Sequence, residues 1–283
     1  LDVRSKIIYN YIIKNKLFRI NMEIKLKSSI PQIFDRKNIQ ASHIKTNNLF
    51  EKIASEIAIR LKETNLYFEN TLELNSKTID TSKKIKETKL IKNLYRTAIN
   101  NPKNQHILNF ISDEEYLAIK HNSMDLVYSI LGLNTINDLP GTFKQIYNSL
   151  KPKGLFIAAF WGEGTLSPLS ESLAYADEKI LGGLYSRVFP FCDIKTLGSL
   201  MQRAGFIMPM ADQEKIIKKY SNLKNLLVDI KSFNDKNILS VRPKNFTPKS
   251  IFKEAEMQLM RANNNQSNFS IPFNIIYVMG WKD

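Results

Sequence analysis

The sequence is poor in the residues on which many functional sites depend. Its 283 residues include one cysteine, Cys192, and three histidines, His43, His106 and His121. A single cysteine excludes an internal disulfide and is typical of a reducing compartment, so we expect a cytoplasmic location. The histidines have no Cys, Asp or Glu at metal-ligand spacing, so we expect no metal site.

Glycine and long apolar runs are scarce as well. The chain has ten glycines, and none falls in Thr71–Ile79, TLELNSKTI, where a nucleotide-type fold would carry a glycine-rich loop after its first strand. No apolar run approaches the length that a transmembrane helix needs. The mean hydropathy of −0.26 and 43% hydrophobic content are ordinary for a globular protein.

Positive charge, in contrast, is in excess. The net charge is +14 and the isoelectric point is near 9.6. Such a charge is typical of proteins that bind nucleic acid or an anionic membrane, but it also arises when lysines are spread over solvated helix faces. We favour the second interpretation and expect no specific nucleic-acid partner, because no binding motif gathers the lysines. Peripheral contact with an anionic membrane stays open.

The segment from Met124 to Trp161 predicts a strand, a crossover helix and a parallel strand. Met124–Ser129 is rich in strand formers, and Leu155–Trp161 is wholly apolar and too short to cross a membrane. Between them, Phe143, Ile146 and Tyr147 lie on one helical face. The Lys-Pro-Lys-Gly run at 151–154 is expected to end this helix.

Strands and helices alternate along the rest of the chain. We expect a helix from Phe34 to Lys62 and helices near Thr165–Leu181, Asp193–Ala204, Asn222–Phe233 and Pro248–Ala262. The other expected strands are Thr71–Leu74, Lys89–Leu94, Gln105–Phe110, Phe206–Met210, Lys215–Tyr220 and Phe273–Gly280. This alternation predicts an α/β protein with a doubly wound, mostly parallel sheet and a late antiparallel strand at its edge.

The chain divides into a short extension and one domain. Residues 1–32 are basic and apolar, and because Met22 is itself a candidate start, the extension is expected to be non-native or disordered. The domain covers residues 33–283 and is expected to carry a helical insertion at about 212–270.

Nearly the whole chain resembles one family. The matching segments are Phe34-Asp35-Arg36, Asp125-Leu126-Val127, Asn137-Asp138-Leu139-Pro140, Leu150–Phe156, Arg203-Ala204-Gly205-Phe206 and Ile276–Trp281. In these segments the chain resembles class I S-adenosylmethionine-dependent methyltransferases. It is most similar to the group that contains the mitochondrial complex I assembly factor of methyltransferase fold, near the malonyl-carrier-protein methyltransferases. The resemblance implies a Rossmann-like, seven-stranded sheet with an antiparallel last strand.

The resemblance also implies a place for the cofactor, S-adenosylmethionine, at the carboxyl ends of the first strands. The acidic end of the first strand is kept as Glu73, but the glycine-rich turn is replaced by Asn75–Thr78. The second strand should end in an acid that binds the ribose, and the candidate there is Asn93 or nothing at all. Asp113 matches the acid near the adenine, although a solvated helix cap is the alternative. We therefore expect Glu73, Asn75 and Asp113 on the cofactor side, with weak or absent binding.

No catalytic residue can be assigned from the sequence. Relatives often carry His-Trp after the fourth strand, where this chain has Asn134-Thr135, which removes the most obvious general base. Tyr128, Trp161 and Tyr277 are candidates to line an acceptor pocket, although aromatic residues at strand ends are commonly part of the core.

Several functions stay open at this stage. The main hypothesis is a methyltransferase-like protein with a degenerate cofactor loop that serves respiratory complex I assembly, with a protein acceptor or complex I subunit as its partner. The alternatives are a non-catalytic scaffold and a protein arginine hydroxylase, the activity linked to the group's mitochondrial member. Whether the chain is an enzyme is left undecided.

Overall fold

The structure is a computed structural model that describes residues 31–38, 48–75, 78–98, 108–233, 237–264 and 267–283. The chain divides into two compact units, Leu1–Ile33 and Phe34–Asp283. All further description concerns the second unit. The expectations for residues 1–30 lie outside the described residues, and the proposed division into extension and domain stays a prediction.

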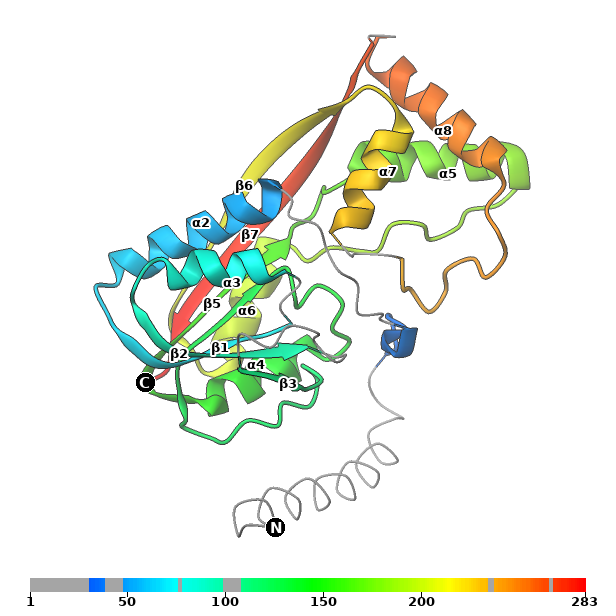
Figure 1. Cartoon of the computed structure of the whole chain (residues 1–283). Helices are drawn as coiled ribbons and strands as arrows, with labels where there is room; N and C mark the ends of the chain where they lie inside the picture. The colour runs from blue at the N-terminus through cyan, green and yellow to red at the C-terminus, as the bar shows by residue number, and fades with distance from the viewer. Residues whose placement is uncertain (1–30, 39–47, 76–77, 99–107, 234–236, 265–266) are drawn as a thin grey trace. The chain divides into compact units, whose positions relative to one another are not determined.

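A seven-stranded sheet forms the centre of this unit (Figure 1). The strands lie in the order β3-β2-β1-β4-β5-β7-β6, and β7 runs antiparallel to both of its neighbours. This confirms the predicted doubly wound sheet with an antiparallel last strand. The prediction that this strand lies at the edge of the sheet is wrong, because β7 pairs with β5 on one side and with β6 on the other. The strands are β1 (Phe68–Glu73), β2 (Ile91–Ala98), β3 (Leu108–Ile111), β4 (Met124–Ile130), β5 (Leu150–Trp161), β6 (Ile207–Tyr220) and β7 (Phe269–Trp281).

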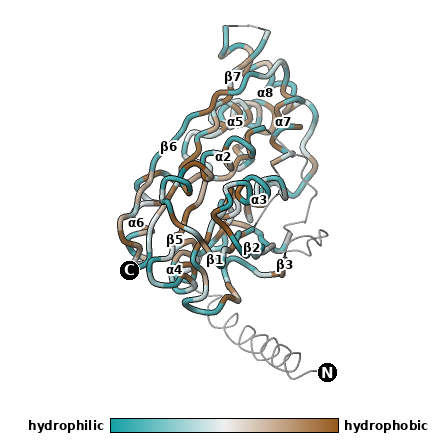
Figure 2. The backbone as a smooth tube through the Cα atoms, turned by 60° about the vertical axis from the view of Figure 1, so that its left-hand side comes forward, coloured by the Kyte–Doolittle hydropathy of each residue, from teal (hydrophilic) through white to brown (hydrophobic). Residues whose placement is uncertain are grey.

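Helices cover both faces of the sheet. On one face, α2 (Asn48–Glu63) packs beside α3 (Ile79–Lys86), and on the other α4 (Leu139–Ser149) packs beside α6 (Ile194–Ala204). Each of α2, α4 and α6 buries one apolar stripe, as the four-residue spacing of Ile53, Ile57 and Leu61 in α2 illustrates. The central strands are the most apolar part of the chain, because both of their faces are buried (Figure 2).

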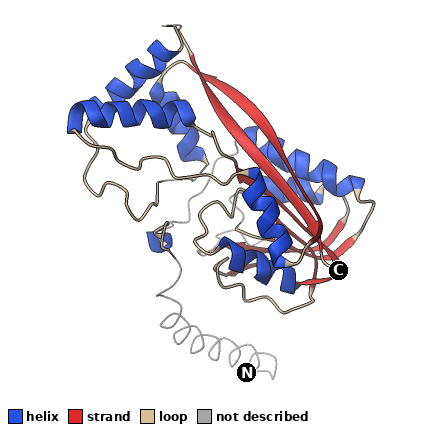
Figure 3. Cartoon of the chain, turned by 180° about the vertical axis from the view of Figure 1, so that it is seen from behind, coloured by secondary structure: helices blue, strands red, loops and turns tan. Residues whose placement is uncertain are grey.

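The long β6–β7 ribbon connects the sheet to a second group of helices (Figure 3). This group consists of α5 (Ser167–Leu181), α7 (Leu223–Ser232) and α8 (Lys249–Ala262), and α5 packs against α8. Among the described helices, none combines the length and the apolar character required to cross a bilayer.

Several strands extend beyond their predicted limits. β2 continues to Ala98, four residues past the predicted end, because its parallel pairing with β1 and β3 continues that far. β5 begins at Leu150, so the predicted stop at 151–154 lies within the strand, where the pairing with β4 shifts register. β6 is one strand of 14 residues where two short ones were expected.

The start of the domain also differs from the prediction. Phe34 forms an isolated bridge with Leu239, and Arg36–Asn38 is a single 3-10 turn, η1. The predicted helix therefore begins at Asn48 and not near Phe34. We call residues Phe34–Arg36 the amino-terminal arm.

Candidate functional site

The sheet order brings the carboxyl ends of β1, β2 and β4 side by side. β1 lies between β2 and β4, and Glu73, at the end of β1, pairs in register with Arg96 of β2 and Tyr128 of β4. We call this region the carboxyl edge. In open α/β sheets, ligands bind at this kind of edge, where the strand order reverses.

Glu73 is buried beneath its neighbours and is part of an ion pair. Its side chain is 1% exposed, and Arg96 Nε lies 3.0 Å from Glu73 Oε2. From α3, Ser82 Oγ donates a hydrogen bond to Oε2 at 2.5 Å and Thr81 Oγ1 donates to Oε1 at 3.3 Å. Arg96 also donates to the Thr78 carbonyl at 3.1 Å. The carboxylate and the guanidinium therefore satisfy each other within the protein.

The chain after β1 is packed closely against the end of β4. Asn75 adopts a left-handed conformation with φ of 47°, and its Nδ2 donates to the Gly132 carbonyl at 2.7 Å. Its backbone N–H donates to Thr97 Oγ1 at 3.1 Å. A Cβ atom on Gly132 would lie 2.7 Å from the Leu74 carbonyl oxygen and 2.8 Å from that of Asn75. Only glycine at position 132 permits this approach.

Asn93 does not lie at the carboxyl edge. It stands near the start of β2, opposite Asn70, and its Nδ2 donates to Asn70 Oδ1 at 3.2 Å. The prediction that placed Asn93 at the ribose position is wrong, because β2 continues past it. The strand instead ends in Arg96, Thr97 and Ala98.

Asp113 follows β3, as predicted, and is held by a cation. Arg36 Nη2 lies 2.8 Å from Asp113 Oδ1, which also accepts the Glu115 backbone N–H at 3.0 Å. The helix-cap alternative is wrong, because Asp113 opens a turn that is closed by an isolated bridge to Tyr116.

Arg36 is the residue that sequence analysis overlooked. Its side chain is 8% exposed and meets three consecutive acids, with Glu114 Oε2 at 2.8 Å and Glu115 Oε1 at 3.5 Å in addition to Asp113. It also donates to the Thr135 carbonyl at 2.8 Å. A run of three acids after a strand is the pattern that indicates a buried cation, but the sequence does not say which arginine supplies it.

Glu114 is the most buried member of this cluster. Its side chain is fully buried, and its Oε1 atom has no hydrogen-bond partner among the described residues. Burial raises the pKa of Glu114 to about 7, and the charge of Arg36 opposes this rise only in part. Near neutral pH the amino-terminal arm is therefore held by a carboxyl group that is close to its titration point.

Asn134 connects the ends of two strands. Its Oδ1 accepts the Trp161 backbone N–H at 2.9 Å, and its Nδ2 donates to the Leu131 carbonyl at 3.0 Å. The position where relatives often carry histidine is therefore occupied by an amide whose described partners are backbone groups.

The three candidate aromatic residues have different surroundings. Tyr128 is fully buried and Tyr277 is 1% exposed. The Arg60 guanidinium lies 4.5 Å from the Tyr277 ring centroid, and the Tyr277 hydroxyl donates to Glu214 at 3.4 Å. These two tyrosines are part of the core, whereas Trp161 lines a cavity.

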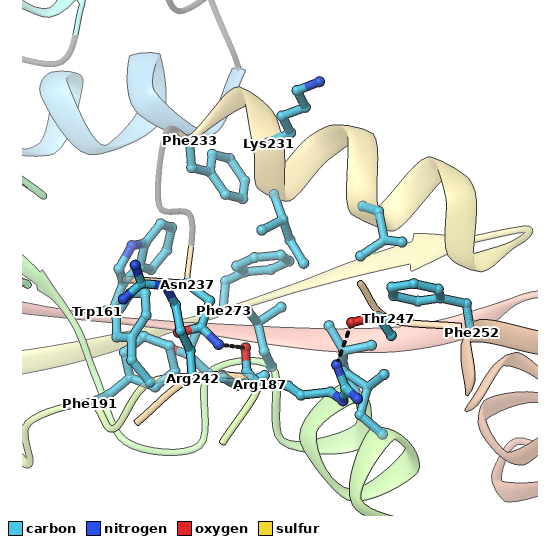
Figure 4. A pocket seen from close by; sticks show the side chains of 18 of the residues that line it. Trp161, Arg187, Phe191, Lys231, Phe233, Asn237, Arg242, Thr247, Phe252 and Phe273 are labelled. Carbon is cyan, nitrogen blue, oxygen red and sulfur yellow. Dashed lines mark hydrogen bonds between the residues drawn. The ribbon is translucent and has the colours of Figure 1, made fainter. Parts of the chain in front are cut away.

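This cavity has a volume of about 430 Å³ and lies between α5, α7, α8 and the end of β5 (Figure 4). Its walls are mostly apolar and include Trp161, Leu169, Phe233 and Phe273. Trp161 is at the carboxyl end of β5, and Phe273 belongs to β7, the neighbour of β5 on the side away from β4. Within the described ranges, no group of three or more His, Cys, Asp and Glu side chains is arranged to hold a metal ion.

Comparison with known proteins identifies relatives. The arginine-hydroxylase NDUFAF5, mitochondrial, of Dictyostelium discoideum is 36% identical over 171 residues, which cover 60% of this chain and 39% of that protein. The malonyl-[acyl-carrier protein] O-methyltransferase of Nitrosospira multiformis is 28% identical over 172 residues, which cover 60% of this chain and 53% of that protein. The chain spans about half the length of the curated relatives it matches, or less.

A solved structure shows the same fold, and a family model shows the family. The YcgJ protein of Bacillus subtilis superimposes with a TM-score of 0.52 at 10% identity, covering 82% of this chain and 98% of that one, which shows the fold alone. The family model described as "Methyltransferase domain" matches residues 41–208, more than half of the chain. The resemblance inferred from the sequence is confirmed, and the chain belongs to the methyltransferase domain family.

Proposed function

We propose that this chain acts through protein contacts in the assembly of respiratory complex I, and that it binds S-adenosylmethionine weakly or not at all. The observation that carries the proposal is the buried Arg96–Glu73 ion pair at the carboxyl edge. A cytoplasmic location and peripheral contact with a membrane belong to the same proposal.

The side chains at the end of β2 do not fit the ribose of this cofactor. In the methyltransferases that the chain resembles, this strand end supplies an acid that accepts hydrogen bonds from the ribose hydroxyls. Here Arg96 turns to Glu73, and Thr97 accepts the N–H of Asn75. Because a hydrogen bond to a charged group contributes ~1.5–3 kcal/mol, loss of the carboxylate alone would weaken binding about ten- to a hundredfold.

The charge at this edge is also unfavourable. S-adenosylmethionine carries a sulfonium cation, and Arg96 places a buried guanidinium in the strand next to β1. Glu73, which would offset that charge, is already neutralised by Arg96. A second cation in this region would therefore compete with Arg96 for the Glu73 carboxylate.

The described backbone after β1, as far as Asn75, is also closely packed. Carbonyl oxygens of Leu74 and Asn75 face Gly132 at distances that exclude even a methyl group, and the Asn75 side chain is bound to the Gly132 carbonyl. Glu73, Asn75 and Asp113 remain our proposed cofactor-side residues, but each already has polar partners inside the protein.

The role in assembly is supported by the relatives. The Dictyostelium discoideum protein is named an arginine-hydroxylase NDUFAF5, and the resemblance of the chain to this group implies a complex I subunit as the partner. Arginine hydroxylation is the second candidate, because the name of this relative states that activity. Mass spectrometry of the partner's peptides would detect it as the gain of one oxygen atom on an arginine.

Calorimetric titration tests the cofactor part of the proposal. The chain is titrated with S-adenosylmethionine and with its demethylated product, S-adenosylhomocysteine, after circular dichroism has established that it is folded. We expect no saturable heat up to millimolar ligand. Saturable binding in the micromolar range would contradict the proposal and favour methyl transfer.

Genetic complementation tests the assembly part. Cells that lack the gene should lose NADH:quinone oxidoreductase activity from their membranes, and the intact chain should restore it. Restoration without any methylated product on the complex I subunits supports action by contact. Normal oxidoreductase activity in the deletion strain would contradict a role in complex I assembly.

A further inference from the structure

The cavity between α5, α7 and α8 has no part in the proposed function. Its volume of about 430 Å³ lies within the ~300–1,000 Å³ that is typical of ligand pockets. α7 and α8 lie between β6 and β7 in the chain, outside the segment that matches the family model. The cavity therefore depends on residues that the family match does not cover.

The walls of the cavity are apolar and aromatic. The Trp161 ring lies 5.4 Å from that of Phe233 and 5.8 Å from that of Phe273, and all three side chains are at most 3% exposed. Aliphatic side chains from α5 and α7, including Leu169 and Ile230, complete the surface. Such a surface favours a ligand that is apolar over most of its length.

Three cations contribute to the lining, and two of them are already paired. The Arg187 guanidinium donates two hydrogen bonds to the buried Asp177 carboxylate, at 2.6 and 2.7 Å, and a third to Thr247 Oγ1 at 2.8 Å. Arg242 pairs with Asp35 of the amino-terminal arm at 3.0 Å.

Lys231 differs from these arginines. Its ammonium has no ion-pair partner among the described residues, and its side chain is exposed at the end of α7 and points outward in Figure 4. Because an exposed residue contributes to the lining, the cavity reaches the surface there. No carboxylate stands among the described side chains that line the cavity.

We propose that this cavity binds the hydrocarbon chain of a single-chain carboxylate amphiphile, a fatty acid, with the carboxylate at the surface beside Lys231. Lys231 is among the residues that line the cavity and its side chain points outward, an arrangement that matches an apolar tail with an anionic end at the surface. The proposal does not depend on whether an adenosyl ligand binds at the carboxyl edge.

The first test is direct titration of the intact chain with saturated fatty acids from octanoate to hexadecanoate, each below its aggregation limit. One-to-one binding is expected, with roughly a three- to fourfold gain in affinity for each added methylene until the cavity is full. Absence of saturable binding for every chain length would overturn the proposal.

The second test uses the two tryptophans of the native sequence. Trp161 ends β5 and lines the cavity, whereas Trp281 ends β7 and pairs with Leu155 in the middle of β5. A fatty acid brominated along its chain should quench Trp161 in a Trp281→Phe variant and leave Trp281 unquenched in a Trp161→Phe variant. Quenching of Trp281 alone would place the ligand elsewhere and overturn the proposal.

Two variants on α7 distinguish loss of binding because the cavity is filled from loss of binding because the fold is disturbed. Ile230→Trp fills the cavity and should abolish binding, whereas Val228→Trp, at an exposed position of the same helix that does not line the cavity, should leave it unchanged. Equal affinities for the two variants would contradict the assignment. If Ile230→Trp does not fold, the quenching measurement decides alone.

The role of the ligand's carboxylate is tested by comparing the acid with the alcohol of the same chain length. Lys231→Gln should weaken binding of dodecanoate about two- to fivefold and leave that of dodecanol unchanged, with Lys224→Gln on the same helix as the control. An equal loss for acid and alcohol would exclude the pairing with Lys231.

Vesicles distinguish a free fatty acid from a membrane lipid. Vesicles of phosphatidylglycerol and phosphatidylcholine should not compete with brominated fatty acid for Trp161 if the ligand is the free acid. Quenching by brominated phospholipid in vesicles, without any binding of the monomeric acid, would overturn the proposal in favour of a membrane surface.

Discussion

Arg96 and Glu73 lie opposite each other on neighbouring parallel strands, with the guanidinium Nε 3.0 Å from the carboxylate at a point where both side chains are almost fully buried. A buried pair is weak evidence for added stability, but removal of one partner leaves an uncompensated charge in the interior. The pair therefore balances two buried charges at the carboxyl edge.

The first prediction concerns this pair. Arg96→Ala should lower the free energy of unfolding by about 3–5 kcal/mol, because Glu73 would remain buried without a counter-ion. Urea denaturation measures the loss. Lys92→Ala is the control, since Lys92 lies on the same strand and pairs with Glu69 at an exposed site, where a much smaller loss is expected. Similar losses for both variants would show that burial does not set the cost.

The second prediction concerns Glu114 and pH. The pKa of Glu114 is about 7 in the folded chain and ~4.3 in an unfolded one, so the folded state binds more protons between these values. The contribution of Glu114 to the free energy of unfolding should therefore fall as the pH rises through this window and level off above pH 7.

Glu114→Gln tests this pH dependence. The variant should show a flatter profile of unfolding free energy between about pH 5 and pH 8 than the native chain. Glu171→Gln, at an exposed position of α5, should leave the profile unchanged. A profile that stays equally steep in Glu114→Gln would assign the titration to another group.

The third prediction concerns the close approach at Gly132. Gly132→Ala should destabilise the fold by roughly 1–3 kcal/mol, because the new methyl group would lie within 3 Å of two carbonyl oxygens. Gly198→Ala within α6 meets no atom within 4 Å and should stabilise the chain by about 0.5–1 kcal/mol. Thermal unfolding of the two variants should thus shift in opposite directions.

The fourth prediction compares two arginines that each form a bidentate ion pair with one aspartate. Arg187 holds the fully buried Asp177, whereas Arg60 holds Asp212, whose side chain is 52% exposed. Lysine can replace the charge but not the two parallel bonds. Arg187→Lys should cost about 1.5–3 kcal/mol and Arg60→Lys less than about 1 kcal/mol in urea denaturation. A larger loss at Arg60 would contradict the role of burial.

Much of the fold could be predicted from local pattern. The apolar run at Leu155–Trp161 and the amphipathic spacing in α2 and α4 reflect burial, which the sequence records directly. The ends of strands were harder to predict, because whether β2 stops at Leu94 or Ala98 depends on its pairing with β1 and β3. That pairing is a tertiary property.

The candidate site was harder to predict for the same reason. Glu73 and Asp113 were chosen because they match acids that the resemblance implies at the end of the first strand and after the third. In the structure Glu73 ends β1 and Asp113 follows β3. Their partners, Arg96 and Arg36, are separated from them by 23 and 77 residues. No local pattern specifies which cation a buried carboxylate will meet, so the ion pairs that occupy this edge became visible only in the folded chain.

The amino-terminal arm has a consequence for synthesis on the ribosome. Asp35 pairs with Arg242, 207 residues later, and Phe34 bridges to Leu239. The first segment of the domain to leave the exit tunnel must therefore wait for the last quarter of the polypeptide before it reaches its native surroundings. During that delay the amino-terminal arm of the nascent domain lacks its partners Leu239 and Arg242. A chaperone that recognises this exposed arm would therefore bind near Phe34 and not near the last strand.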